Sequence, residues 1–180
     1  MIGLRKTTIL LIISFLTLFS AYAENKSVSI NNSTGAEISF IFTGSSDTLA
    51  LSVKDKIDVS VAVTQQIAVK IATSVSVGTK LISLSLRSLM PDFVIWTVGA
   101  GAAYKMESMK ISADIGLASL KITGLQPSYE ALLYISASSV FNITSSQLYS
   151  IDAGLNADLM FNSNIFSFGA GGFVSLGVLL

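Results

Sequence analysis

The feature that most constrains the fold is a long-range alternation of apolar and polar residues. In residues 149–161 every second residue, starting with Tyr149, is apolar, while Asp152 and Asp158 are among the residues between them. Successive side chains of a β-strand point to opposite faces, so this period of two predicts strands with unlike faces. The same alternation recurs in 57–64, 67–77, 82–87, 94–105, 111–117 and 166–180. The exceptions include Ile95, Met160 and Phe173, and the alternation is less regular in 129–141. The pattern predicts an all-β protein.

Clusters of turn-forming residues separate these segments. They lie at 31–35, 44–47, 65–66, 78–79, 91–92, 107–108, 124–128, 145–146 and 162–164. Ten segments result if a short strand around Val28 and Ile30 is included. Up-and-down barrels of bacterial outer membranes have an even number of strands. We therefore expect ten strands, or eight if the amino-terminal stretch is irregular.

The first 23 residues resemble a secretory signal peptide. Arg5 and Lys6 precede the apolar run 9–19, and Ala21-Tyr22-Ala23 supplies the small-x-small pattern of a cleavage site before Glu24. The alternative is an uncut anchor, but the run is shorter than the roughly 20 residues that a spanning helix needs. We expect cleavage after Ala23 and a single domain over residues 24–180.

The composition favours a membrane protein. Charged residues make up 12% of the chain, about half the roughly 25% that is usual in soluble domains. Residues 159–180 carry no charge and could span a bilayer as a helix, but their alternation argues against a helix. The strands of a secreted β-sandwich also alternate between apolar and polar residues. In this chain, however, the face that a sandwich exposes to water would consist of Ser and Gly with few charges. A transmembrane antiparallel up-and-down β-barrel fits the sequence better than a helical bundle or a sandwich.

The charges of the predicted strands lie mostly on the polar face. An Arg or Lys that faces lipid at mid-membrane costs roughly 2 to 4 kcal/mol, whereas a lumen charge can find partners. We therefore predict a lumen charge network, whose members are Glu37, Asp58, Lys70, Arg87, Lys105, Asp114, Glu130, Asp152 and Asp158. Asp55, Lys80 and Lys121 break the pattern.

Three cations and six anions make up this predicted network. The anion excess favours a narrow, cation-preferring diffusion pore. A closed lumen with buried ion pairs is the other interpretation, because small barrels are filled by side chains and an unpaired buried charge is costly. We favour the closed lumen.

The residue types argue against an enzyme. The chain has no Cys and no His, which excludes disulfides, thiolate or imidazole metal sites, cysteine nucleophiles and histidine triads. The segment 99–104 resembles the start of a dinucleotide fingerprint, but its sixth position is Tyr104 and no helical pattern follows. Eleven basic and eleven acidic residues without a basic run do not favour nucleic acid. We expect no catalytic, cofactor or metal site.

The signal-like segment, the alternating strands and the carboxyl-terminal run 166–180 together resemble the small bacterial outer-membrane β-barrel proteins of the OmpA, OmpX and OmpW type. The resemblance implies an outer-membrane location, contact with lipid and recognition of the last strand by the barrel-insertion machinery. That signal usually ends in an aromatic residue, and here the last residue is Leu180. We expect a non-enzymatic role in structure or surface contact. A surface adhesin is a further alternative, although the gaps between the predicted strands are short.

A fractionation experiment tests this interpretation. We expect the mature polypeptide in the membrane fraction, and a circular dichroism spectrum in detergent with the signature of β-structure. Recovery of the protein dissolved in plain buffer, or a spectrum rich in α-helix, would contradict the barrel prediction.

Overall fold

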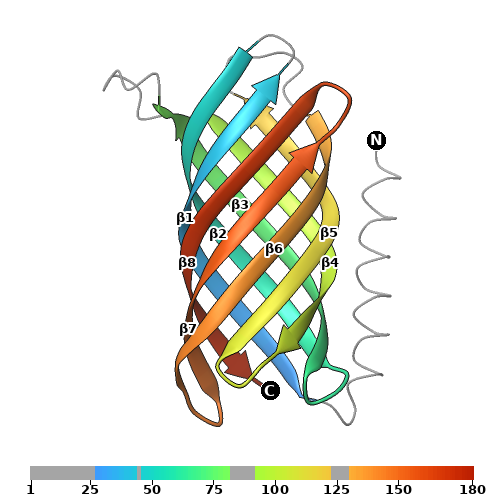
Figure 1. Cartoon of the computed structure of the whole chain (residues 1–180), viewed down its shortest axis with the longest axis vertical. Coiled ribbons are helices and arrows are strands. Elements are labelled where there is room, and N and C mark those ends of the chain that lie inside the picture. Colours follow the sequence, from blue (N-terminus) through green and yellow to red (C-terminus); the bar gives the residue numbers. More distant parts are fainter. Residues whose placement is uncertain (1–26, 44–45, 82–91, 123–129) are drawn as a thin grey trace, which may run out of the picture.

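The computed structural model describes residues 27–43, 46–81, 92–122 and 130–180. Eight antiparallel strands form a closed barrel in chain order, and β1 pairs with β8 to close it (Figure 1). The strands are β1 (Val28–Thr43), β2 (Ser46–Ala62), β3 (Ile67–Lys80), β4 (Phe93–Lys105), β5 (Met109–Ile122), β6 (Glu130–Ser145), β7 (Tyr149–Phe161) and β8 (Ile165–Leu179). The all-β antiparallel barrel predicted from the sequence is confirmed.

The expected count of ten strands is wrong, and eight is the observed number. The predicted turn at 31–35 lies within β1, which pairs without interruption with β2 and β8. Gly78 and Thr79 likewise lie within β3, and β3 pairs directly with β4. No separate strand therefore lies between β3 and β4 in the barrel wall; most of the segment expected there, 82–91, lies outside the described residues.

Two of the misread turn signals contain glycines that leave room for a neighbouring strand. A Cβ on Gly35 would collide with the backbone and Cβ of Phe173, and a Cβ on Gly78 would collide with the ring of Phe93. Glycine in a strand marks a close approach as often as a turn. The amino-terminal stretch is therefore regular strand from Val28 onward, and its small polar residues Asn31 and Ser33 face the lumen.

The turns expected at Gln65-Gln66, Glu107-Ser108 and Asn162–Asn164 are confirmed as the connections after β2, β4 and β7. In the last of these, the side-chain oxygen of Asn162 accepts hydrogen bonds of 2.8 Å from the backbone N–H groups of Asn164 and Ile165. These short connections hold neighbouring strands in register.

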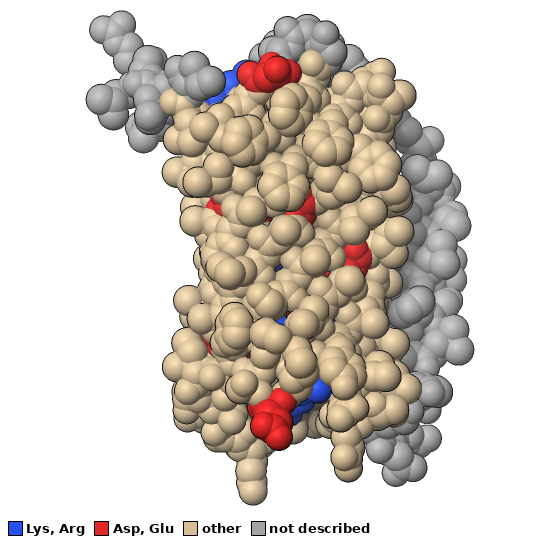
Figure 2. Space-filling model, viewed as in Figure 1, with Lys and Arg blue, Asp and Glu red and all other residues tan. Residues whose placement is uncertain are grey.

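The outer face of the barrel is an apolar belt. Trp96, Ile115 and Leu155 point outward from β4, β5 and β7 and are 61%, 58% and 62% exposed. In the view of Figure 2, charged atoms gather mainly at the two ends, and the surface between them is mostly uncharged. Asp55 points outward within this belt, and the hydroxyl of Thr34 donates a 2.8 Å hydrogen bond to its carboxylate.

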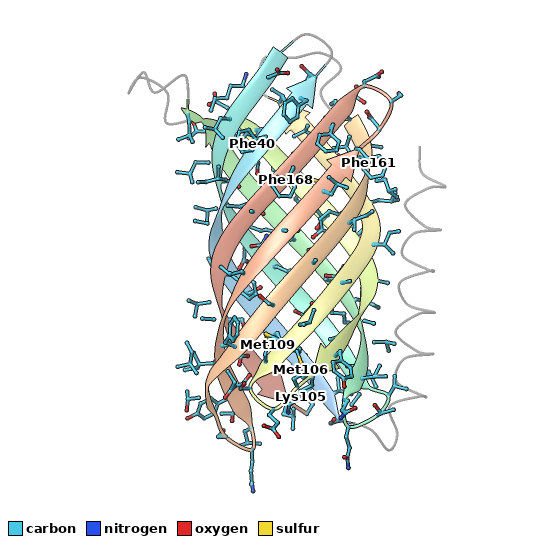
Figure 3. The ribbon with its side chains drawn as sticks, in the orientation of Figure 1. Phe40, Lys105, Met106, Met109, Phe161 and Phe168 are labelled. Carbon is cyan, nitrogen blue, oxygen red and sulfur yellow. The ribbon has the colours of Figure 1, made fainter. Side chains whose placement is uncertain are left out.

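Aromatic side chains lie toward both ends of the belt. Phe40, Phe161 and Phe168 lie toward one end (Figure 3), and the exposed Tyr104 and Tyr149, near the end of β4 and at the start of β7, lie toward the other. The end where β1 begins and β8 finishes is called the terminal end below, and the end with the β1–β2, β3–β4, β5–β6 and β7–β8 connections is called the far end.

No helix among residues 27–43, 46–81, 92–122 and 130–180 is long and apolar enough to cross a bilayer.

Several breaks in the alternation have one structural cause. Apolar residues point inward near the far end and form a buried apolar layer. Its members are Ile41, Ala50, Phe93, Ile95, Ala118, Leu120, Leu132, Tyr134, Met160 and Ile165. They come from the last part of β1, β5 and β7 and the first part of β2, β4, β6 and β8, which meet at the far end.

The belt predicts a difference between two arginine substitutions. Ile115→Arg places a charge near the middle of β5 and should lower the free energy of unfolding by about 2–4 kcal/mol in lipid vesicles. Leu148→Arg, in the turn between β6 and β7, should have little effect because that side chain is 71% exposed beyond the strands. Urea unfolding followed by the fluorescence of Trp96, the single tryptophan, measures both. Equal effects would mean that the outer face does not contact lipid.

Candidate functional site in the barrel lumen

Six charged side chains meet in the middle of the lumen, and they are called the charge cluster below. They are Glu37 on β1, Lys54 and Lys56 on β2, Lys70 on β3, Asp114 on β5 and Asp158 on β7. Three ammonium groups face three carboxylates, so the cluster has no net charge. All six side chains point into the lumen, and the opposite faces of their strands form the apolar belt.

One half of the cluster is centred on Lys54. Its ammonium pairs with Asp158 and lies 3.5 Å from Glu37. Asn156 donates to Glu37 at 3.0 Å and to Asp158 at 3.3 Å, and Ser39 donates to Glu37 at 2.9 Å. These donors offset part of the cost of burying two carboxylates beside one cation.

The other half is centred on Asp114. One oxygen, Oδ2, accepts hydrogen bonds from Lys56 at 2.9 Å and Lys70 at 3.0 Å. Lys70 also donates to the hydroxyl of Ser112 at 2.7 Å. The first half has two carboxylates for one ammonium and the second half has two ammoniums for one carboxylate. The adjacent positions of Lys54 and Lys56 on β2 let the two halves balance each other.

Two glycines leave space for these carboxylates. A Cβ on Gly169 would collide with Oε1 of Glu37, and a Cβ on Gly101 would collide with Oδ1 of Asp114. Small residues at these positions of β8 and β4 therefore allow the acidic side chains to lie flat against the neighbouring strand.

The structure brings together four of the nine residues of the predicted network: Glu37, Lys70, Asp114 and Asp158.

The other predicted members lie elsewhere. Asp58 accepts a 2.9 Å hydrogen bond from Asn31, and Asp152 accepts bonds from Asn142 at 2.7 Å and Ser150 at 2.9 Å. Both carboxylates therefore have uncharged partners.

Three predicted members lie outside the middle of the lumen or beyond the described residues. Lys105 is exposed at the terminal end. Glu130 begins β6 at the far end, where Asn162 donates to it at 3.2 Å. Arg87 lies outside the described residues.

Sequence reasoning missed Lys54, Lys56 and Lys110. The signal was available, because Lys54 and Lys56 alternate in phase with Asp58, and Lys110 alternates in phase with Asp114. Adding these three lysines to the three predicted cations gives six cations against six anions. The anion excess on which the cation-preferring pore rested was therefore an error of counting.

Two polar cavities lie along the lumen. A small cavity of about 40 Å³ adjoins the charge cluster and is lined in part by Lys54, Lys56 and Lys70. A larger cavity of about 460 Å³, called the vestibule below, lies at the terminal end between the β2–β3, β4–β5 and β6–β7 connections. Asn31 and Lys110 line both cavities. From the terminal end to the far end, the lumen thus holds the vestibule, the charge cluster and the apolar layer.

Within the described parts of the chain, no three His, Cys, Asp or Glu residues are grouped so that they could hold a metal ion.

Comparison with known proteins identifies the fold but does not identify a sequence family. No family model matches the chain, and no curated protein matches its sequence. The solved structures that resemble it include Ail, the attachment invasion locus protein of Yersinia pestis, with a TM-score of 0.56 and 15% identity over 86% of this chain and 99% of Ail. Neisserial surface protein A has a TM-score of 0.55 and 12% identity over 83% and 96%. The outer membrane protein AlkL, solved in lipid bilayers, has a TM-score of 0.53 and 8% identity over 86% and 90%.

These likenesses cover nearly the whole length of each solved chain, so the chain has the fold of small eight-stranded outer-membrane β-barrels. At 8–15% identity they concern the fold alone.

The pairing of Lys54 predicts a large loss of stability when it is removed. Lys54→Met leaves Glu37 and Asp158 buried beside each other, and we expect a loss of about 3–5 kcal/mol in the free energy of unfolding. Adding Asp158→Asn should recover a substantial part of that loss, because the second unpaired charge disappears. A double-mutant cycle in urea measures the coupling. Lys80→Met at the far end is the matched control, and additive effects of the two cluster substitutions would refute the pairing.

Proposed function

We propose that this protein is a non-enzymatic integral protein of a bacterial outer membrane, with a role in structure or surface contact and a lumen that does not conduct ions. The apolar belt and the barrel closed by β1 and β8 support the membrane location. The likeness to solved outer-membrane barrels supports it as well.

The observation that carries the closed lumen is the presence of two successive obstructions. An ion that passed through would have to cross the charge cluster, where every ammonium already pairs with a carboxylate. It would then have to cross the apolar layer, where Leu120, Leu132 and Tyr134 are each 2% exposed. Dehydrating an ion at an apolar constriction is costly, which is how hydrophobic gates close channels.

In our proposal, the protein reaches the membrane by the usual route of outer-membrane β-barrel proteins. Residues 1–23 are removed as a signal peptide after Ala23, and residues 24–180 form the barrel. The barrel-insertion machinery recognises β8, whose outward residues Phe166, Phe168 and Val174 are apolar and alternate with small polar ones. Amino-terminal sequencing of the membrane-inserted protein, with Glu24 as the expected first residue, tests the cleavage.

A surface adhesin is the second candidate. The two longest connections, between β3 and β4 and between β5 and β6, lie at the same far end of the barrel. Outer-membrane barrels have short periplasmic turns and longer extracellular loops, so this end would face the cell exterior. Ail is described as an attachment invasion locus protein, which gives a precedent for the fold. Loss of binding to a host surface on deletion of 124–128, with the barrel still folded, would favour this role.

Electrical recording distinguishes the closed lumen from the pore. We expect no single-channel steps when the folded protein is inserted in planar bilayers, because both obstructions remain in place. Arg87→Ala should also be silent, whereas the pore hypothesis expects a wider or more cation-selective channel from that variant. Insertion is verified independently by the gel shift between heated and unheated samples. Steady openings of the unaltered protein would refute the closed lumen.

A further inference from the structure

The vestibule contains two lysines that have no partner. Lys105 and Lys110 occupy directly opposed positions at the ends of β4 and β5, and both belong to the inward faces of their strands. Within the described residues, neither ammonium forms an ion pair or a side-chain hydrogen bond. Lys105 lies at the lower end of the barrel beside the Met106 turn (Figure 3). Like charges directly opposed across two strands repel each other, so this arrangement is unfavourable without an anion.

Lys110 differs from a surface lysine in its setting. It is half-buried and lines both the vestibule and the small cavity beside the charge cluster. The three lysines of the charge cluster, by contrast, are paired with carboxylates. Lys110 therefore lies at the inner part of the vestibule as a half-buried cation, and such a group binds anions more strongly than an exposed one.

The carboxylates of the vestibule form no ion pair with these lysines within the described residues. Both oxygens of Asp152 are occupied, one by Asn142 and the other by Ser150. Glu107 lies in the β4–β5 turn, is exposed and forms no ion pair within the described residues. Lys105 and Lys110, at the ends of β4 and β5, thus line a cavity of about 460 Å³, large enough for a small organic anion.

We propose that the vestibule is a binding site for a small anion with a phosphate or carboxylate group, held by Lys105 and Lys110. The anion enters at the terminal end and stops before the charge cluster, so the site is a dead end. This site does not depend on the membrane in which the barrel lies, and it goes beyond the closed-lumen proposal because a sealed barrel can still bind a solute at one mouth.

The test is a titration of the folded protein in a non-ionic detergent at low salt. Inorganic phosphate and succinate are added separately, and NMR chemical shifts of the 105–110 hairpin are followed. We expect saturable shifts with at least one of the two probes; phosphate alone, succinate alone or both would identify the preferred group. Shifts that do not saturate with either probe would overturn the proposal.

Four variants make the test specific. Lys110→Met should weaken binding about tenfold, since a charge-assisted hydrogen bond contributes about 1.5–3 kcal/mol and 1.4 kcal/mol is a factor of ten. Lys110→Arg should keep most of the affinity. Glu107→Gln should strengthen binding, because it removes a competing carboxylate from the same wall. Lys80→Met, at the far end, should leave the affinity unchanged.

Folding of each variant is checked by the gel shift between heated and unheated samples. Equal affinity in Lys110→Met and in the unaltered protein would overturn the proposal, as would equal weakening by Lys80→Met.

Discussion

The closure of the sheet is the constraint on which the rest of the structure depends. A backbone N–H or C=O left unpaired in a bilayer costs several kcal/mol, so a spanning sheet cannot keep free edges. Here the edge strands β1 and β8 pair with each other over Ser29–Thr43 and Ile165–Leu179. Closure then fixes the two faces, because every strand must direct one set of side chains outward and the other set into a narrow lumen.

The narrow lumen explains the unusual chemistry of its walls. Eight strands leave room for side chains and little else, so each inward position must fit against those across the barrel. Large inward side chains lie over glycines of a neighbouring strand, as the ring of Phe173 does over Gly154 and Glu37 does over Gly169. The charges in the middle of the lumen form a neutral set, the three lysines and three carboxylates of the charge cluster. Where the set is incomplete, at Lys105 and Lys110, the lumen widens into the vestibule.

The order of the layers connects the structure to its function. The vestibule is open at the terminal end, the charge cluster lies in the middle and the apolar layer lies at the far end. The two ends of the lumen therefore differ chemically: the terminal end is polar, and the far end is lined by apolar side chains that include Leu120, Leu132 and Tyr134. The proposed closed lumen, with contacts made at the ends and the belt of the barrel, is consistent with this order.

The sequence alone determined the class of fold, because a period of two is a local property of the strand. It also predicted that Glu37, Lys70, Asp114 and Asp158 face the lumen, since facing depends only on parity. It could not determine the number of strands, because Gly35 and Gly78 carry the same local signal whether they make a turn or leave room for atoms of a neighbouring strand.

Only the tertiary structure decided which inward charges meet. Lys54 and Asp158 are separated by 104 positions in the chain and pair across the lumen. Asp58, which shares its face with Lys54, bonds instead to Asn31. The same holds for the apolar exceptions Ile95 and Met160, which look like errors of alternation in the sequence and form one layer in space. The physical reason is that the register of each strand pair and the closure by β1 and β8 set the height of every residue along the barrel. The local alternation of residues determines neither the register nor the closure.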